Sequence, residues 1–469
     1  MPADIFAELS WRGLVYQSTD ETGLQAWLNQ GQRVVYAGFD PTADSLHIGS
    51  LLPLVMLRRF QKAGHKPIAL AGGATGMIGD PSGKSAERNL LDEEKIAHNL
   101  SCIQNQLSLI LDFEPGDNQA VLVNNADWTG KFSYIEFLRD VGKNFSVNVM
   151  LAKDSVKSRI EGDVGISYTE FSYMLLQAYD FVHLNRAFGC ELQIGGSDQW
   201  GNITAGIDLG RRMNSAQLYG LTCPLLTKSD GSKMGKTETG TIWLDGQKTS
   251  PYQFYQYLVT LADDDVGKCL RFLTDLPQEE IVALDQSRQE QPHLRESQKR
   301  LAEEMTRMLH GEDGFGKALN ATEIFFGAEI ENLTDSELSQ IFTDVPSVAS
   351  ARDGLGGEGL ALIDAMTMVG IAKSKGEARR AIGEGGAYVN NRRVGEVEYR
   401  LKETDLASES FIVLRRGRNA TTLTQIRVAL TAFLELWRLL PSKKTDCPNK
   451  YWTLEFGFLF DCLENSGIR

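Results

Sequence analysis

Residues suited to binding a charged group lie in three separated stretches of this 469-residue chain. The first is FDPTADSLHIGS, residues 39–50, where Thr42 and His47 precede Gly49. A helix that begins at the end of a buried strand offers free N–H groups and the positive end of its dipole, so it favours phosphate. Thr42 and His47 can donate hydrogen bonds to phosphate oxygens, and Gly49 leaves room for a flat ring. The stretch is a weak signal alone, because a lone histidine is more often a capping or surface residue.

A second stretch supplies positive charge. LLTKSDGSKMGKTETG, at residues 225–240, places Lys228, Lys233 and Lys236 in a Gly-rich segment with little apolar content. Lysines in such a segment are usually solvated, which is the ordinary alternative. Beside a helix start that favours phosphate, they could also neutralise the charge of a polyphosphate.

Polar side chains also recur at helical spacing. In SYMLLQAYD, Tyr173, Gln177 and Asp180 fall at i, i+4 and i+7, so they share one face of the predicted helix. Polar groups on the inward side of an apolar helix need partners. LQIGGSDQWGN then adds a strand that ends in Gly-Gly and is followed by Asp198 and Gln199. These side chains are therefore candidates for contact with a polar substrate.

A Gly-rich turn, AGGATGMIGD, ends a further strand and carries Asp80, which could meet a cationic group. The default role for a lone Asp in such a turn is structural. The overlapping GMIGDPSGKS invites comparison with a phosphate-binding loop, which needs four residues between its first Gly and Gly-Lys-Ser. Only three residues separate Gly79 from Gly83, so we reject that motif.

Composition limits the class of protein. With 469 residues, of which 42% are hydrophobic, the chain can form two or three domains, each with its own core. The net charge of −14 argues against a broadly basic surface for nucleic acid. Six cysteines without a C-x-x-C pair predict reduced thiols, with neither a disulfide framework nor a zinc site. The start of the chain lacks a secretory signal and no apolar run approaches about 20 residues, so we expect a soluble cytoplasmic protein.

The first half of the chain alternates predicted strands and helices. Apolar strands at 33–39, 66–76 and 120–128 flank helices at 47–64 and 85–111. This βαβαβ order predicts an α/β fold with a doubly wound parallel sheet. Ligands of such sheets bind at the carboxyl ends of the strands, which is where the candidate residues fall.

The second half is organised differently. Residues 246–350 are helical in pattern, and a Gly-rich linker is predicted at 351–359. Residues 360–420 suggest two helices and a short hairpin, whereas 421–469 suggest a helix packed on that module and a disordered end. The stretch 358–420 holds eleven Lys and Arg against nine Asp and Glu, so it could present a locally basic face to RNA.

Taken together, HIG after a strand, GGSDQWGN and the KMGKT loop resemble the signatures of class I aminoacyl-tRNA synthetases. YAGFDPTADSLHIG, GGATGMIGDPSG, TEFSYMLLQAYDF and LQIGGSDQWGNI resemble the tyrosyl-tRNA synthetases of bacteria in particular. The resemblance is collinear from residue 5 to residue 418, and the C-terminal module resembles the S4-like RNA-binding domain of that family.

The resemblance implies a Rossmann-like catalytic domain over 1–245, a helical anticodon-side domain over 246–350 and an S4-like domain over 360–420. Residues 421–469 would be an atypical tail of unknown role. The implied reaction activates L-tyrosine with ATP, accompanied by Mg²⁺, to tyrosyl-adenylate, and then transfers tyrosine to tRNA(Tyr). The implied assembly is a homodimer, with 137–151 and the segment near Tyr168 in the dimer region.

The resemblance also implies roles for individual residues. The catalytic contacts to phosphate would come from Thr42, His47, Lys233 and Lys236. Tyrosine would be bound by Tyr36, Asp80, Tyr173, Gln177, Asp180 and Gln199. ATP would be bound by Gly38, Asp40, His47, Gly49, Ser50, Gly196, Asp198, Lys233, Met234 and Lys236. No metal ligands are predicted.

Some residues depart from the family pattern. Ser50 stands where the signature has a second His, and Gly235 stands where many members have Ser. A non-catalytic RNA-binding relative is therefore an alternative, although the signature residues it would not need are present. A tryptophan-specific relative shares the fold, but Tyr36 and Asp180 are suited to a phenol.

Overall fold

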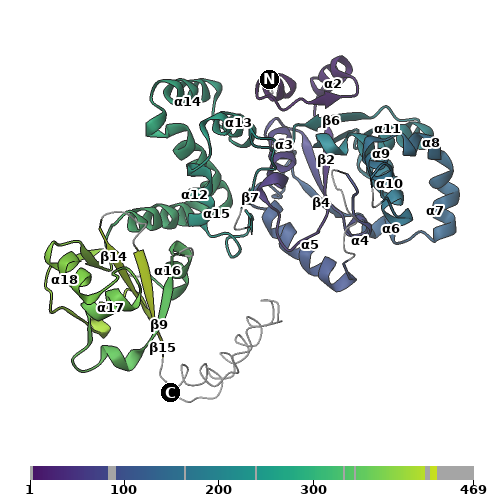
Figure 1. The fold of residues 1–469 in the computed structure, drawn as a ribbon. Helices are drawn as coiled ribbons and strands as arrows, with labels where there is room; N and C mark the ends of the chain where they lie inside the picture. The colour runs from purple at the N-terminus through teal and green to yellow at the C-terminus, as the bar shows by residue number, and fades with distance from the viewer. Residues whose placement is uncertain are drawn as a thin grey trace. The chain divides into compact units, whose positions relative to one another are not determined.

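The computed structural model describes residues 4–82, 91–162, 165–237, 240–330, 333–342, 345–417 and 423–429. Its contacts divide the chain into two compact units, Met1–Thr322 and Glu323–Arg469. The two units are drawn in Figure 1 and are described here separately.

A six-stranded sheet forms the centre of the first unit, in the order β1-β6-β5-β2-β3-β4. β1 is antiparallel to β6, and the other neighbours are parallel. The strands are β1 Gln17–Ser18, β2 Val34–Phe39, β3 Lys66–Ala71, β4 Val121–Asn124, β5 Leu192–Gly196 and β6 Tyr219–Cys223. The chain runs outward from β2 to β4 and then returns to β5 on the other side of β2. The predicted doubly wound fold is confirmed, and β2 and β5 flank its topological switch point.

Helices cover both faces of this sheet (Figure 1). They are α1 Ile5–Trp11, α2 Glu21–Leu28, η1 Ile48–Ser50, α3 Leu51–Lys62, α4 Thr75–Ile78, α5 Glu93–Leu107, α6 Ala126–Thr129, α7 Tyr134–Asp140, η2 Gly142–Asn144, α8 Val147–Leu151, α9 Asp154–Ile160, α10 Tyr168–Phe188, η3 Ser197–Gln199 and α11 Trp200–Asn214. Alternate side chains of β2 explain the two layers: Val35 and Ala37 join the core beneath α3, whereas Tyr36 joins the core beneath α10.

Sequence signals fix the ends of α10, the helix that carries three of the candidate residues. Ser167 caps its start by accepting a hydrogen bond from the Glu170 N–H. Gly189 ends it in the left-handed region, at φ 63°. Within these limits Tyr173 and Asp180 are buried, and they bond to Asp40 and Asn125, which directly follow β2 and β4.

The helices that follow the sheet do not form a separate core. They are α12 Pro251–Val259, α13 Asp263–Leu273, α14 Gln278–Glu290, η4 Pro292–Leu294 and α15 Glu296–Phe325, after the short strands β7 Lys236–Thr237 and β8 Gly240–Thr241. Phe254, Leu270 and Met305 belong to the same apolar cluster as Leu54 of α3. The predicted domain boundary at residue 245 is therefore not a break between compact units, because these apolar helix faces pack onto the α3 side of the sheet.

The second unit is an α+β module. Its elements are α16 Asp335–Ile341, β9 Ser347–Ala351, η5 Arg352–Leu355, β10 Leu360–Ala361, α17 Leu362–Met368, α18 Lys375–Gly383, β11 Ala387–Val389, β12 Arg392–Val394, β13 Arg400–Leu401, η6 Glu403–Asp405, β14 Phe411–Arg416 and β15 Leu423–Ala429. The main sheet has the order β12-β11-β14-β15-β9. Asn390 and Asn391, at φ 48° and 65°, make the tight turn of the β11–β12 hairpin. The two predicted helices and the short hairpin are confirmed.

Two boundaries of this module differ from the prediction. The stretch 351–359 is not a linker between units, because β9 precedes it in the same sheet and Leu355 is buried in the module's core. The tail also begins later than expected. Residues 423–429 form β15, which is antiparallel to β14 and parallel to β9, and Ile426 is buried. The helix predicted at 428–440 is wrong at its start, because residues 428 and 429 belong to β15, and the rest of that range lies outside the described residues.

Ending the chain at residue 422 would remove β15, the strand to which β9 is hydrogen-bonded in the described sheet. Because the buried Ile426 would also be lost, we expect the second unit to melt about 10 °C lower or more. The adenylate formation implied for the first unit should be unchanged. Differential scanning calorimetry and a pyrophosphate-release assay measure the two effects.

A chain that ends at Ala429 keeps β15 and is the matched control. Loss of adenylate formation in the shorter chain alone would contradict the division into units.

Candidate active site

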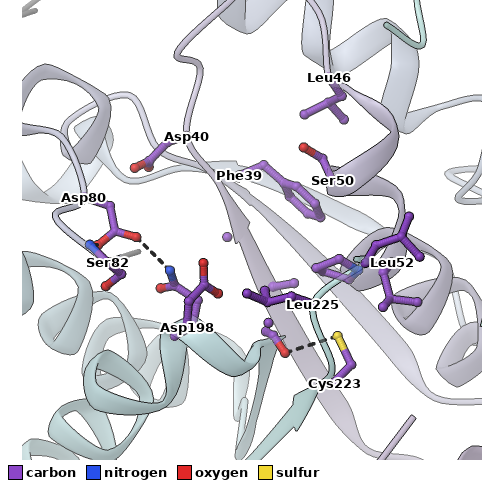
Figure 2. Close-up of a pocket in the computed structure, with 18 of the residues that line it drawn as sticks. Phe39, Asp40, Leu46, Ser50, Leu52, Asp80, Ser82, Asp198, Cys223 and Leu225 are labelled. Carbon is purple, nitrogen blue, oxygen red and sulfur yellow. Dashed lines mark hydrogen bonds between the residues drawn. The ribbon is translucent and has the colours of Figure 1, made fainter. Parts of the chain in front are cut away.

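A cavity of about 340 Å³ opens at the carboxyl ends of β2 and β5, beside the start of α3. All seventeen candidate residues line it: Tyr36, Gly38, Asp40, Thr42, His47, Gly49, Ser50, Asp80, Tyr173, Gln177, Asp180, Gly196, Asp198, Gln199, Lys233, Met234 and Lys236. Stretches as far apart in sequence as 36–50 and 225–236 therefore meet in one pocket. Figure 2 shows Asp40, Asp80 and Asp198 grouped on one side of it, with Ser50 and Leu52 on the other.

Asp180 lies at the buried end of the cavity, with 1% of its surface exposed. Its Oδ1 accepts a hydrogen bond from Trp128 Nε1 at 2.8 Å, and its Oδ2 accepts one from Asn125 Nδ2 at 3.0 Å. Burial raises the pKa of Asp180 to about 7, although these two hydrogen bonds act to lower it. The two hydrogen bonds thus fix the position of the carboxylate but offset only part of the free-energy cost of burying its charge.

Tyr36 lies near this carboxylate. Its ring packs edge-on against Phe181, with the centroids 5.1 Å apart. Its hydroxyl is buried and has no hydrogen-bond partner among the described residues. Burial, followed by the charge of Asp180, raises the pKa of Tyr36 well above its usual value. Because an unpaired buried hydroxyl costs free energy, this group is suited to a polar atom of a ligand.

A chain of hydrogen bonds links Asp180 to the β2 end. Asn125 Nδ2 also donates to Thr75 Oγ1 at 3.0 Å, and Thr75 Oγ1 donates to Asp40 Oδ1 at 2.7 Å. The other carboxylate oxygen of Asp40 accepts from the Tyr173 hydroxyl at 2.8 Å. Burial raises the pKa of Tyr173 well above its usual value, so it remains a donor at neutral pH.

Asp80 is the centre of a second polar group. Its carboxylate accepts hydrogen bonds from Gln199 Nε2 at 2.7 Å and from the Ser82 N–H at 2.9 Å. Gln199 Oε1 in turn accepts from Gln177 Nε2 at 3.2 Å. The Oε1 of Gln177 is buried without a partner in the described chain. A carboxylate and an unsatisfied acceptor at one place favour a cationic N–H donor.

The HIGS stretch, residues 47–50, forms the 3₁₀ turn η1 and leads into α3. A side chain at Gly49 would come within 2.9 Å of the His47 ring, so the glycine permits that ring's position. Ser50 Oγ lies 3.5 Å from His47 Nδ1. The Ile48 N–H donates to the Ile242 carbonyl, which joins this stretch to the chain that follows the lysines.

The lysine loop, defined here as described residues 225–237, brings Lys233 and Lys236 to the cavity with exposed side chains. Between them, Met234 is buried. Gly235 has φ +84°, and a Cβ on it would lie 2.1 Å from Ile48 Cγ2. In this conformation, glycine at 235 avoids both the strain of a positive φ and a clash with Ile48.

The pocket separates charge. Asp40, Asp80 and Asp198 lie on one side of it, and Asp180 is fully buried, whereas the side chains of His47, Lys233 and Lys236 are exposed. Such an arrangement favours a ligand with a cationic group placed deep and an anionic, phosphate-bearing group outside. The described residues contain no group of three or more His, Cys, Asp or Glu placed to hold a metal ion.

Several residues of the site were missed in the sequence. These are Thr75, Asn125, Trp128 and Asn202, which bond to predicted residues, and Gln193, whose buried Oε1 lines the cavity without a described partner. Gln193 could have been noticed as the polar residue of a buried strand. Asn125 and Trp128 follow β4, and their proximity to Asp180 depends on the order of strands in the sheet.

Comparison with known proteins identifies the class. Residues 28–327 match the family of class I tRNA synthetases specific for tryptophan and tyrosine. Residues 337–424 match the SYY-like C-terminal domain of tyrosine–tRNA ligases. A C-terminally truncated mitochondrial tyrosyl-tRNA synthetase from Aspergillus nidulans has a similar structure, with a TM-score of 0.63 and 30% identity over 69% of this chain and 94% of that one. The fold is that of a class I aminoacyl-tRNA synthetase.

Full-length relatives narrow the class further. The tyrosine–tRNA ligase of Rhodopirellula baltica is 55% identical over 90% of this chain and 96% of its own length. That of Roseiflexus castenholzii is 54% identical over 88% of this chain and 97% of its own. The chain therefore belongs to the tyrosine–tRNA ligase family, and its activity is the ATP-dependent joining of tyrosine to tRNA. The alternative of a non-catalytic RNA-binding relative is not favoured.

The raised pKa of Asp180 predicts a pH dependence of stability. Its folded pKa of about 7 exceeds the ordinary value of 3.8, so the folded chain binds the additional proton. The contribution of Asp180 to stability is fully present below pH 3.8 and is lost as the pH rises through about 7. We therefore expect Asp180→Asn, which carries no charge, to gain melting temperature relative to the native chain between about pH 5 and about pH 8. Thermal melting of both chains across this range measures the difference.

Asp208→Asn, which alters an exposed carboxylate on α11, controls for general charge effects. A constant difference between the native chain and Asp180→Asn at every pH would contradict the assignment.

Proposed function

We propose that Tyr36 and Asp180 recognise the phenol of tyrosine. The observation that carries this proposal is the buried Tyr36 hydroxyl, which lacks a described partner beside an incompletely compensated carboxylate. A phenol can donate its proton to Asp180 and accept from Tyr36, which satisfies both groups. Phenylalanine would leave them unpaired. A site built for a hydroxyl rejects the analogue that lacks it by about 10⁵, a ratio already established for tyrosyl-tRNA synthetases as a class.

The ammonium of tyrosine would lie among Asp80, Tyr173 and Gln177. The Oε1 of Gln177, which is buried without a described hydrogen-bond donor, and the negative charge of Asp80 support this position. Gln199, which bonds to both Asp80 and Gln177, would lie near the carboxylate of tyrosine and fix its direction.

ATP would occupy the outer part of the cavity. Thr42 and His47 would donate to the γ-phosphate, and Asp198 would accept from a ribose hydroxyl. Gly38, Gly49 and Gly196 would let the nucleotide approach the backbone, with Asp40, Ser50 and Met234 completing its surroundings. Lys233 and Lys236 would neutralise the pyrophosphate, and Mg²⁺ would enter with the phosphates of ATP as part of the substrate.

The chemistry requires alignment more than proton transfer. The carboxylate of tyrosine is already ionised, so its attack on the α-phosphorus needs no general base. The bond between the α-phosphorus and the bridging oxygen breaks, and the charge that develops on pyrophosphate needs cationic donors. Fixed donors of this kind contribute about 10²–10³ in rate each. The adenylate then loses its acyl group to the 3′ end of tRNA(Tyr).

Tyr36→Phe tests the phenol assignment. Because one neutral hydrogen bond is lost, we expect kcat/KM for tyrosine in ATP–pyrophosphate exchange to fall about three- to tenfold. Activity with phenylalanine should not fall, so discrimination should decrease. Tyr179→Phe, which alters a buried tyrosine of α10 that does not line the pocket, is the matched control. An equal loss for both amino acids would contradict the assignment.

We also propose that the chain acts as a homodimer in the cytoplasm. Large apolar side chains are exposed close together in sequence, including Tyr134 at 63%, Ile135 at 68% and Val147 at 58%. The Tyr134 and Tyr168 hydroxyls lie 3.2 Å apart, which brings the Tyr168 segment to the same surface. Exposed apolar groups of this kind favour an interface. The free cysteines support a reducing compartment, and no described helix has the length and apolar character of a membrane span.

Ile135→Asp tests the dimer surface. A charge buried at an interface without a partner should weaken the dimer at least about tenfold. Sedimentation equilibrium measures the dissociation constant, and Val282→Asp, on exposed α14, is the control. A native chain that is monomeric, or equal effects of the two variants, would contradict this surface.

A further inference from the structure

The lysine loop is held by contacts from outside the pocket. The Ser229 N–H donates to Asp265 Oδ1 at 2.7 Å, and Lys268 Nζ donates to the Thr227 carbonyl at 2.6 Å. Both bonds go to the backbone of the loop, so they fix its path without depending on the identity of its side chains. Both come from α13, which contributes no residue to the cavity lining.

A third contact comes from the same face of α13. Cys269 Sγ lies 3.5 Å from Met234 Sδ, and both groups are buried. Asp265, Lys268 and Cys269 stand at i, i+3 and i+4, so their side chains project from one side of the helix. Met234 directly follows Lys233 and precedes Lys236 by two positions, so anchoring it limits where both lysines can reach.

A fourth contact comes from α12. The Gly235 N–H donates to the Tyr257 hydroxyl at 2.8 Å. Burial raises the pKa of Tyr257 to about 12, so the hydroxyl stays neutral at physiological pH. On its other side Gly235 packs against Ile48. Tyr257 therefore holds the loop at the position where it touches the HIGS stretch.

The two lysines have no comparable anchor of their own. Within the described chain, no hydrogen bond or ion pair holds the ammonium of Lys233 or Lys236, and both side chains are exposed. Their location at the cavity is consequently set by the backbone that carries them. Loop contacts made far from the phosphates can then govern how well the lysines meet them.

We propose that Tyr257, Asp265 and Lys268 form a latch that positions Lys233 and Lys236 for the adenylate step. These three are positioning residues, because they contact the loop and not the substrates. The inference rests on the proposed role of the lysines at pyrophosphate. Weakening the latch should slow adenylate formation while leaving the buried tyrosine site intact.

Tyr257→Phe and Asp265→Ala each remove one hydrogen bond to the loop. We expect each to lower the single-turnover rate of adenylate formation at saturating ATP about three- to tenfold. Trypsin cleavage after Lys233 and Lys236, followed by mass spectrometry, should accelerate by a similar factor, because the loop leaves its bound position more often. The dissociation constant for tyrosine and the melting temperature should not change.

Two further variants separate positioning from general damage. Tyr255→Phe removes, from the same helix, the hydroxyl of a buried tyrosine that makes no described hydrogen bond, and should match the native chain. Asp265→Asn keeps an oxygen that can accept from the Ser229 N–H, and should recover most of the rate lost in Asp265→Ala.

Equal rates and equal cleavage in Tyr257→Phe and Tyr255→Phe would overturn the latch. So would a loss of tyrosine binding and melting temperature that matches the loss of rate, because that pattern marks damage to the fold. If the native chain formed no adenylate, the proposed function would fail, and the trypsin comparison would still decide whether the latch exists.

Discussion

Asp180 is buried, where an ionised carboxylate is unfavourable, and hydrogen bonds from several elements of the site offset part of that free-energy cost. Its two oxygens accept hydrogen bonds from Asn125 and Trp128, which follow β4 at the edge of the sheet. Asn125 also donates a hydrogen bond to Thr75, and Thr75 donates one to Asp40, at the end of β2. One polar chain therefore connects the deep end of the pocket with the strand that leads into the HIGS stretch. Removing a member leaves an unpaired buried polar atom on its neighbour, which costs more free energy than one hydrogen bond contributes.

The order of the strands makes this connection possible. β2 and β5 are neighbours at the switch point, so segments that follow them diverge and leave a crevice. Asp198 and Gln199 enter it from η3, and HIGS enters it from η1. The lysine loop reaches the same crevice because α12 and α13 pack onto the α3 side of the sheet and hold it there. Buried carboxylates and exposed lysines thereby line one cavity.

Local pattern in the sequence was sufficient for β2, β3, β4 and the helices between them, whereas the resemblance to the synthetase family supplied most of the residues that line the cavity. The apolar run of β2 correctly predicted a buried strand. The spacing of Tyr173, Gln177 and Asp180 correctly predicted that they share one side of a helix, and all three line the cavity. Both patterns are properties of neighbouring residues. Asn125 and Trp128 were missed because their role depends on β4 standing two strands from β2. The predicted linker at 351–359 was wrong for a related reason, because β9 is fixed by β15, a strand more than seventy residues later. Glycine content gives no information about such distant pairing.

The most direct measurement of the central claim is a crystal structure of the native chain with bound tyrosine. The prediction is that the phenol oxygen lies within about 3 Å of both the Tyr36 hydroxyl and a carboxylate oxygen of Asp180, with the ammonium beside Asp80 and Gln177. A phenol found elsewhere in the cavity, with the Tyr36 hydroxyl still unpaired, would contradict it.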